Sequence, residues 1–323
     1  MVATQDIVIN AGRIGISDAV GTAGHSCPLR DVQASGADLA MSGNATMPTQ
    51  MTELMRKVLA LLSTLLPGIV CTSLASAAES STDDRLSFSV DGSTLSDSGN
   101  GGGASLGWLH NFNADSIVGL GAEYQGIANT HWTFGTLSGS TTRAASNGKL
   151  SIYGEVQKGA GDFGAQGFDY SVVDAGVIRT FNQKFSLQVE DRQIDIFTTH
   201  GNLPQIQAAA RWNPRWLTTV AYAHSVSGNL GTDLGSMRID RYMPTINLFA
   251  GGALGKAAPV ALGVETEVVQ PPGTLREVFL GASKSLRRAD FTLVGDYLDL
   301  ASRRQVTVTL SCILHLRVPA QTK

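Results

Sequence analysis

Two groups of closely spaced charged residues are the side chains in this sequence that could do chemistry together. The first group is Glu190, Arg192 and Asp195, and the second is Arg238, Asp240 and Arg241. Enclosed charges must be paired, because burying an unpaired charge costs on the order of several kcal/mol. In a wider interior the same charges would line a wet passage and set its preference for ions. We therefore predict that all six side chains line the interior of the protein, as structural ion pairs or as the wall of a pore.

A hydrolytic site is a second chemistry that the sequence allows. His224 stands next to Ser225, and Glu190 or Asp191 could supply the acid if the fold brought these residues together. The histidines after the first hundred residues show no pair at the spacing of a metal-binding motif. Chance combinations of this kind are common in a sheet, so we expect no catalytic residue, no metal and no cofactor. A hydrolase acting on lipid or lipopolysaccharide is kept as an alternative.

The composition excludes several classes of protein. The chain has 323 residues, with 24 Lys and Arg against 27 Asp and Glu, and a formal net charge of -3. This balance gives no strong positive field for binding nucleic acid. Hydrophobic residues make up 43% of the chain, which argues against disorder, and no apolar run reaches the length of about 18 residues that a membrane helix needs. With 36 Gly and only 16% charged residues, the chain reads as a Gly-rich, strand-forming protein.

A secretory signal peptide is predicted inside the chain, over residues 55–78. It has a basic start at Met55-Arg56-Lys57, an apolar core over 58–66 and the small residues Ala75-Ser76-Ala77 for cleavage. Residues 1–54 precede this leader and show no sustained helical or strand period. We interpret residues 1–54 as an upstream extension from a mis-assigned gene start, and we expect the rest of the chain to be exported to a bacterial envelope.

The clearest strand pattern lies at the end of the chain. Between Val306 and Val318 the even positions are apolar and the odd positions are polar, with Ile313 as the exception. At roughly 3.3 Å per residue such a strand can cross a bilayer at a tilt. The same alternation recurs around residues 86–91, 150–157 and 185–190. It changes phase near Asp191, which indicates a bulge or a strand that leaves an apolar layer.

Turn signals separate these strands and suggest hairpins. They are Asn113-Ala114-Asp115, Asn147-Gly148, Asn182-Gln183 and Asn213-Pro214-Arg215. Trp212 and Trp216 flank the last of these turns, where an aromatic girdle would meet the headgroup layer. Segments recur about every 12 to 20 residues, which predicts a transmembrane antiparallel β-barrel of about 12 strands, in a range of about 10 to 14, over residues 79–323.

Several segments resemble the YaiO-type outer-membrane barrels. They are Trp132-Thr133-Phe134-Gly135, the turn that contains Trp212 and Pro214, and Arg238-Ile239-Asp240-Arg241-Tyr242. The resemblance covers roughly residues 85–318, and it implies an envelope location and a link to surface polysaccharide, with no catalytic residues to carry over. Many barrels of that class end on an aromatic residue used in assembly, whereas here Val318 is followed by Pro319-Ala320-Gln321-Thr322-Lys323.

These patterns predict an outer-membrane barrel in a Gram-negative envelope. We expect a small pore, or an accessory to the export or display of surface polysaccharide. The expected partners are outer-membrane lipid, the barrel-assembly machinery, and polysaccharide or small solutes, with no nucleic acid. The main alternative is a secreted or periplasmic β-sandwich that binds carbohydrate, since sandwich strands also alternate.

Overall fold

The computed structural model describes residues 83–96, 99–113, 115–127, 130–163, 166–182, 184–196, 199–257, 273–300 and 303–317. The predicted upstream extension (1–54) and signal peptide (55–78) lie outside these residues, as does the tail after Arg317. Among the described residues there is no helix whose length and apolar character would let it cross a membrane.

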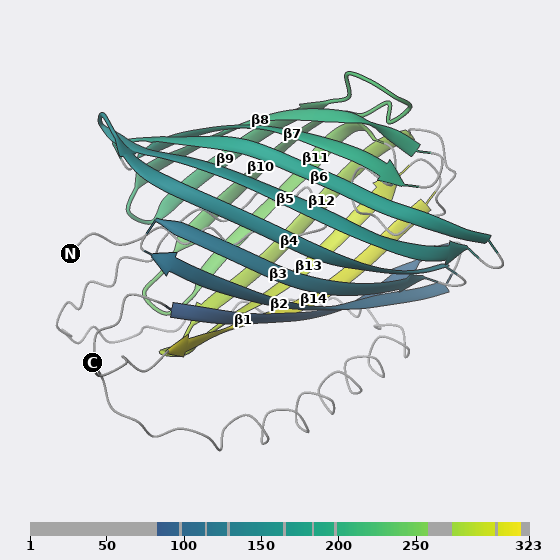
Figure 1. Cartoon of the computed structure of the whole chain (residues 1–323), viewed down its shortest axis with the longest axis horizontal. Coiled ribbons are helices and arrows are strands. Elements are labelled where there is room, and N and C mark those ends of the chain that lie inside the picture. The colour runs from purple at the N-terminus through teal and green to yellow at the C-terminus, as the bar shows by residue number, and fades with distance from the viewer. Residues whose placement is uncertain are drawn as a thin grey trace, which may run out of the picture. The chain divides into compact units, whose positions relative to one another are not determined.

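Fourteen antiparallel strands form one closed barrel (Figure 1). The strands are β1 (Asp83–Leu95), β2 (Gly99–Asn113), β3 (Ser116–Ile127), β4 (Thr130–Ala145), β5 (Gly148–Phe163), β6 (Gln166–Phe181), β7 (Phe185–Ile196), β8 (Thr199–Asn213), β9 (Trp216–His224), β10 (Asp233–Tyr242), β11 (Asn247–Ala257), β12 (Gly273–Ser285), β13 (Ala289–Leu300) and β14 (Arg303–Arg317). Each strand pairs with its neighbours in sequence, and β1 pairs with β14 to close the sheet. The predicted all-β antiparallel barrel is confirmed, with fourteen strands instead of about twelve. The β-sandwich alternative is wrong, because one sheet closes on itself.

The two ends of the barrel differ in their connections. One end, called the turn end here, carries the start of β1, the end of β14 and six hairpin connections, of which the longest joins Tyr242 to Asn247. The other end, called the loop end, carries the two longest connections, which join β9 to β10 and β11 to β12.

Asparagines make several of the tight connections at the turn end. Asn147 and Asn182 have positive φ angles of 57° and 49°, a conformation that asparagine tolerates better than most residues. The side-chain oxygen of Asn213 accepts a hydrogen bond of 2.8 Å from the backbone nitrogen of Arg215. In the same way, Asn113 Oδ1 accepts a hydrogen bond of 2.8 Å from the Asp115 backbone nitrogen, so an asparagine closes each of the four turns predicted from sequence.

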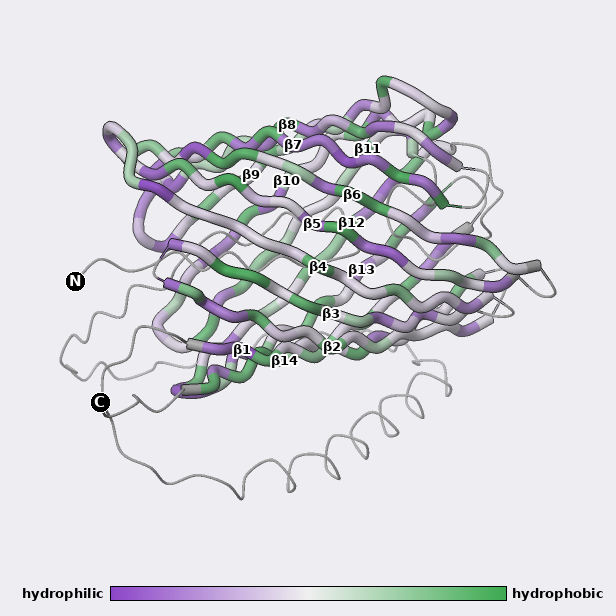
Figure 2. Tube along the Cα trace, viewed as in Figure 1, coloured by the Kyte–Doolittle hydropathy of each residue, from purple (hydrophilic) through white to green (hydrophobic). Residues whose placement is uncertain are grey.

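Large apolar side chains cover the outer face of the barrel over most of its length. Leu106, Leu137, Val189 and Leu280 are all more than half exposed. Figure 2 shows hydrophobic and hydrophilic residues alternating along the strands. Such alternation puts one set of side chains outside the sheet and the other inside. The outer face is therefore apolar where a water-soluble barrel would be polar.

The polarity of the two faces reverses toward the loop end, and β7 shows this within one strand. Its outward positions run from apolar at Phe185, Leu187 and Val189 to polar at Asp191, Gln193 and Asp195. Its inward positions run from Gln188, Glu190 and Arg192 to the buried Ile194 and Ile196. The pairing of β7 with β6 and with β8 is continuous through this point. The part of the outer face covered by apolar side chains is called the apolar band. The phase change expected near Asp191 arises because β7 extends past this band, and the strand has no bulge there.

Apolar side chains line parts of the interior of the loop end in two separate clusters. The first comprises Phe134, Phe168, Tyr170, Val172, Ile194, Ile196, Leu203, Ala223 and Leu230, with Trp132 packed against it. The second comprises Leu234, Ala253, Ala257, Leu275, Leu298 and Leu300. Beyond the apolar band, the barrel is therefore built like a water-soluble one, with its hydrophobic core inside.

The segment between β9 and β10 is pinned over this core. The backbone nitrogen of Val226 donates to the Asn202 carbonyl at 3.1 Å, and that of Asn229 donates to the His200 carbonyl at 2.9 Å. These bonds attach the segment to the part of β8 that is not paired with β9. They place Leu230, which is fully buried, in the first apolar cluster.

Interior glycines let large side chains lie flat across the neighbouring strand. Gly159 on β5 pairs with Phe134 of β4 on one side and with Tyr170 of β6 on the other. The two rings stack across it, with centroids 4.7 Å apart and planes 9° from parallel. A methyl group on Gly159 would lie 2.0 Å from the Thr133 carbonyl oxygen, so no larger residue fits there. The high glycine content thus has a packing role.

Candidate functional site: the polar belt of the barrel interior

A belt of polar and charged side chains lines the interior next to the apolar clusters. Its best-defined part centres on Arg192 of β7. The Arg192 Nε donates to Asp174 Oδ1 of β6 at 2.8 Å, and an Nη of the same guanidinium lies 3.8 Å from a Glu190 carboxylate oxygen. One cation therefore sits between two carboxylates, which neutralises only part of the local negative charge.

Tyr153 extends this network from β5. Its hydroxyl donates a hydrogen bond to the Glu190 carboxylate and accepts one from Gln188 Nε2 at 2.8 Å. Tyr153, Gly176 and Glu190 occupy one row across β5, β6 and β7, so the tyrosine must cross the middle strand. Only a glycine leaves room, since a methyl group on Gly176 would lie 2.3 Å from the Tyr153 hydroxyl.

A second branch of the belt lies beside Asp174. The Gln157 side chain donates to Glu155 at 2.6 Å and accepts from the Tyr170 hydroxyl at 2.8 Å. Tyr170 belongs to the first apolar cluster as well, so its hydroxyl marks the level where the apolar interior gives way to the polar belt. Hydrogen bonds hold these side chains in fixed positions.

Three strands further round the wall, Arg238 and Asp240 form a buried ion pair within β10. Arg238 Nε lies 3.0 Å from Asp240 Oδ1, and Nη2 lies 2.7 Å from the same oxygen. The guanidinium also lies 4.1 Å from the centre of the Phe249 ring. Phe249 in turn lies across Gly281 of β12, where a methyl group would meet its ring at 2.3 Å. The arrangement fixes the arginine by a charge on one side and a ring on the other.

Among the described side chains, the strand alternation directs more acids than bases into the interior. The inward acids are Asp91, Glu123, Glu155, Asp174, Glu190, Asp240, Glu277, Asp290 and Asp296. The inward Lys and Arg are Arg85, Lys149, Arg192, Arg211 and Arg238. The described interior is therefore acidic, although the whole chain is close to neutral.

The structure separates the six side chains predicted to line the interior. Glu190, Arg192, Arg238 and Asp240 project inward, in two ion-paired groups on different strands. Asp195 projects outward from β7, in the part that extends past the apolar band, so its prediction is wrong. Closeness in sequence to Arg192 was misleading, because odd and even positions of one strand lie on opposite faces.

Arg241 is the second correction. It projects outward from β10 at the turn end, and its guanidinium lies 5.4 Å from the centre of the Trp216 ring. Trp216 and Trp212 also project outward there, and Trp212 Nε1 donates to Thr218 Oγ1 at 3.0 Å. The two tryptophans stand at the edge of the apolar band, the place at which we expect a girdle.

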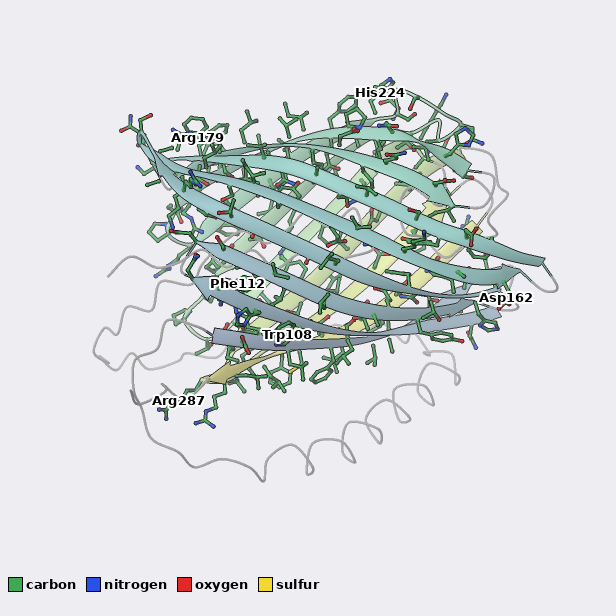
Figure 3. All side chains as sticks on the ribbon, in the orientation of Figure 1. Trp108, Phe112, Asp162, Arg179, His224 and Arg287 are labelled. Carbon is green, nitrogen blue, oxygen red and sulfur yellow. The ribbon has the colours of Figure 1, made fainter. Side chains whose placement is uncertain are left out.

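The residues considered for a hydrolytic site do not converge. His224 lies on the outer face at the loop end (Figure 3), and Glu190 lies in the interior. Ser225 Oγ accepts a hydrogen bond of 2.9 Å from the Thr232 backbone nitrogen. Asp191 projects outward and accepts a hydrogen bond from Asn202 at 3.2 Å. Within the described ranges, the structure brings no three His, Cys, Asp or Glu residues together as metal ligands.

Sequence reasoning missed Tyr153, Asp174 and Phe249 as parts of the belt. Asp174 stands where the inward face of β6 changes from apolar to polar, so the strand has no single hydrophobic face to reveal it. A usable signal was the pairing of each aromatic residue with a glycine on the next strand, but this requires knowledge of the register.

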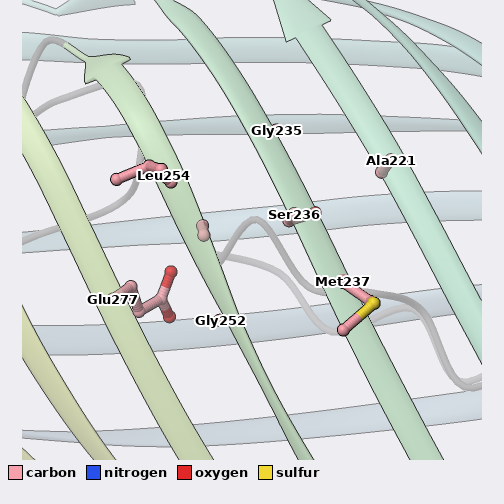
Figure 4. Close-up of a pocket in the computed structure, with 8 residues that line it drawn as sticks. Ala221, Gly235, Ser236, Met237, Gly252, Leu254 and Glu277 are labelled. Carbon is pink, nitrogen blue, oxygen red and sulfur yellow. The ribbon is translucent and has the colours of Figure 1, made fainter.

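A recess of about 420 Å³ lies in the wall formed by β9 to β12 (Figure 4). It is lined by Ala221, Gly235, Ser236, Met237, Gly252, Ala253, Leu254 and Glu277. The recess exists because the neighbouring strands carry glycine, alanine and serine at this level. Glu277 is its one charged group, so we assign no ligand to it.

The fold is similar to that of known channels. The CymD monoaromatic hydrocarbon channel matches with a TM-score of 0.50 and 9% identity, over 75% of this chain and 90% of that one. A FadL homologue from Pseudomonas aeruginosa matches with a TM-score of 0.48 and 8% identity, over 73% and 91%. The KdgM porin matches at 0.38 and 10%, over 69% and 97%. At these identities the likeness concerns the fold alone. No protein-family model matches the chain, and no curated protein is similar to it in sequence.

Proposed function

We propose that this protein is a passive channel of a Gram-negative outer membrane that favours small cations over anions. The observation that carries the proposal is the pairing of an apolar outer face with an acidic, hydrogen-bonded interior in one closed barrel. Closure of the sheet pairs each strand with two neighbours, which is the condition for crossing lipid with strands.

The proposed location follows from the outer face. Side chains such as Leu106, Leu137 and Leu280 would gain by leaving water for hydrocarbon, at about 25 cal/mol per Å² of apolar surface. The polar outer face at the loop end would project beyond the bilayer. The predicted leader and the fold likeness to outer-membrane channels also support this location.

The proposed ion preference follows from the interior. Among the described side chains, nine carboxylates point inward, compared with five Lys or Arg. Low-dielectric walls concentrate the field of such charges, which raises the local concentration of cations and repels anions. Arg192 and Arg238 are each paired with one of these carboxylates, so the ion pairs leave the excess of inward acids over inward bases unchanged.

The polysaccharide role implied by the YaiO-type resemblance is a separate proposal. It would require sugar rings to reach aromatic faces, yet Phe134, Phe168 and Tyr170 are each less than a tenth exposed. Since no contact in the described residues favours that role, we give the channel priority. For the same reason we propose no enzymatic activity.

The test is a bilayer recording on the protein expressed from Met55. Cells are fractionated first, and the membrane fraction is run on a gel with and without heating, because a folded barrel migrates differently when unheated. The purified barrel is then placed in a planar bilayer with a KCl gradient. We expect discrete conductance steps and a reversal potential displaced toward that of K⁺.

Charge-neutralising variants make the experiment specific. Glu123→Gln and Glu277→Gln remove inward charges, so together they should move the reversal potential toward zero. Asp195→Asn removes a charge from the outer face and should leave it unchanged. A soluble periplasmic protein, or a folded barrel that never conducts, would overturn the channel. Conductance that favours Cl⁻ would overturn the ion preference alone.

A further inference from the structure

The outer surface of the barrel has opposite charge character at its two ends. Figure 3 shows Arg179 and Arg287 at one end and Asp162 at the other. At the turn end, four basic residues project outward from strands: Arg143, Arg179, Arg241 and Lys284. Four more lie in the turns themselves: Lys184, Arg215, Arg287 and Arg288.

These eight Lys and Arg residues form a basic collar. Few acidic residues lie near the collar. Among the described outward and turn side chains of the turn end, the acids are Asp84 and Asp115. Asp84 Oδ1 lies 2.6 Å from His110 Nδ1, so a neighbouring imidazole engages it. The collar is thus positively charged along the part of the rim that runs from β4 to the turn between β12 and β13.

The loop end shows no such excess. Its described outward acids are Asp162, Asp169, Asp191, Asp195, Asp233 and Asp299. Its described outward bases are Lys158, Lys256, Arg276 and Arg304. In a membrane, each end would contact the headgroups of a different lipid leaflet. The difference in outward charge between the two ends therefore suits two leaflets of different charge.

Two arginines of the collar are stacked on rings at the edge of the apolar band. Arg241 pairs directly with Trp216 across β10 and β9, with its guanidinium carbon 5.4 Å from the ring centre. Arg179 lies 5.2 Å from the centre of the Phe181 ring, and it donates to the Ser146 carbonyl. Stacking on a ring face orients a guanidinium and leaves its N–H edge available to oxygen acceptors. The rings themselves suit the boundary between hydrocarbon and headgroups.

We propose that the basic collar binds the headgroups of anionic phospholipids, such as phosphatidylglycerol, in the leaflet that faces the turn end. Arginine and lysine at this depth meet lipid phosphates, and arginine can bind one phosphate through two N–H groups. Short turns of outer-membrane barrels face the periplasm, where the leaflet is made of phospholipid, and the two longest connections here lie at the other end. The inference rests on the proposed insertion of the barrel in a membrane.

The test measures lipid preference by quenching of tryptophan fluorescence. Trp108, Trp212 and Trp216 are outward-facing and report on adjacent lipid. The barrel is reconstituted in phosphatidylcholine with an increasing fraction of brominated phosphatidylglycerol, or of brominated phosphatidylcholine as reference. The ratio of the two apparent binding constants is the measured quantity. We expect a preference for phosphatidylglycerol of about threefold or more, falling toward one in 1 M NaCl because surface charges are then screened.

Two matched double variants distinguish an effect of the collar from an effect of the protein's total charge. Arg179→Gln with Arg241→Gln should lower the ratio toward one, because the two arginines stacked on rings are removed and six collar charges remain. Lys158→Gln with Lys256→Gln, which removes the same charge at the loop end, should leave the ratio unchanged. Heat modifiability on a gel confirms that each variant is folded. A wild-type ratio near one, or equal losses in both double variants, would overturn the inference. Absence of quenching by brominated phosphatidylcholine would instead overturn membrane insertion, and with it the proposed function.

Discussion

Tyr153 on β5 donates a hydrogen bond to Glu190 on β7, and it reaches that carboxylate by lying across Gly176 of the strand between them. The contact joins three strands through side chains as well as through the backbone. It also keeps Glu190 in the interior together with Arg192 and Gln188. One glycine therefore determines the shape of the most highly connected part of the polar belt.

Gly176→Ala should displace the Tyr153 ring and break its hydrogen bond to Glu190. The expected loss of stability is about 1.5–3 kcal/mol, the range for a hydrogen bond to a charged group. Urea unfolding of the reconstituted barrel, followed by tryptophan fluorescence, measures it. Gly154→Ala is the control, because its methyl group would face outward at 3.5 Å from the Asp174 carbonyl oxygen. Equal effects of the two substitutions would contradict the assignment.

Arg192→Gln should destabilise the barrel more strongly, because Asp174 and Glu190 would then face each other without a cation. Removing one partner from a buried ion pair typically costs about 3–5 kcal/mol, and the partly wet interior places this case at the lower end. Adding Asp174→Asn to the variant should recover much of the loss, since the orphaned charge is removed. A double-mutant cycle without coupling would show that the two residues act independently.

Leu230→Ala should loosen the segment between β9 and β10. The side chain is fully buried among interior apolar residues, and truncation of such a leucine costs about 2–5 kcal/mol when the site cannot collapse. Because the segment is also held to β8 by two backbone hydrogen bonds, we expect local release without unfolding of the barrel. Faster proteolytic cleavage between residues 225 and 232, with an unchanged gel shift, would report it. The control variant Val226→Ala truncates an exposed side chain, and the protease should cleave it at the wild-type rate.

Cys312 should be unreactive toward water-soluble maleimides in the folded barrel. It stands on the outer face of β14 but is only 2% exposed, because Phe88 and Phe291 occupy the paired positions on both neighbouring strands. Phe88→Ala and Phe291→Ala together should uncover the thiol and allow labelling by a membrane-permeant reagent. Cys27→Ser and Cys71→Ser form the background for the assay. Rapid labelling of the unsubstituted barrel by a charged reagent would contradict this packing.

The barrel could be predicted from sequence because its strands alternate and its turns carry asparagine. The long alternating run from Val306 onward forms β14, as expected. The predicted number of strands, about twelve, was two too low. Gly-rich and Ser/Thr-rich strands such as β2 and β4 show little contrast in hydrophobicity between their two faces. Backbone pairing, which holds these strands in the sheet, leaves no trace in a hydrophobic pattern.

The interior site could be predicted only in part. Alternation indicates that two faces exist without stating which face is inside, and here the inward face changes character along a strand. Glu190 and Asp195 illustrate the problem, since both are acids of β7 and only one faces the interior. The glycines under Tyr153 and Phe249 depend on the register of adjacent strands, which a single sequence does not fix.

The seam between β1 and β14 has a consequence for biogenesis. Asp83 pairs with Arg317 and Leu95 pairs with Gln305, so the first and last strands of the sheet are hydrogen-bonded along their whole length. Ring closure must therefore wait until the final strand has been delivered, and a chain cut before β14 would expose two unpaired edges. Such edges invite aggregation. We expect the intermediate to depend on a chaperone or a template strand that shields them, and premature termination to yield a degraded product instead of a smaller barrel.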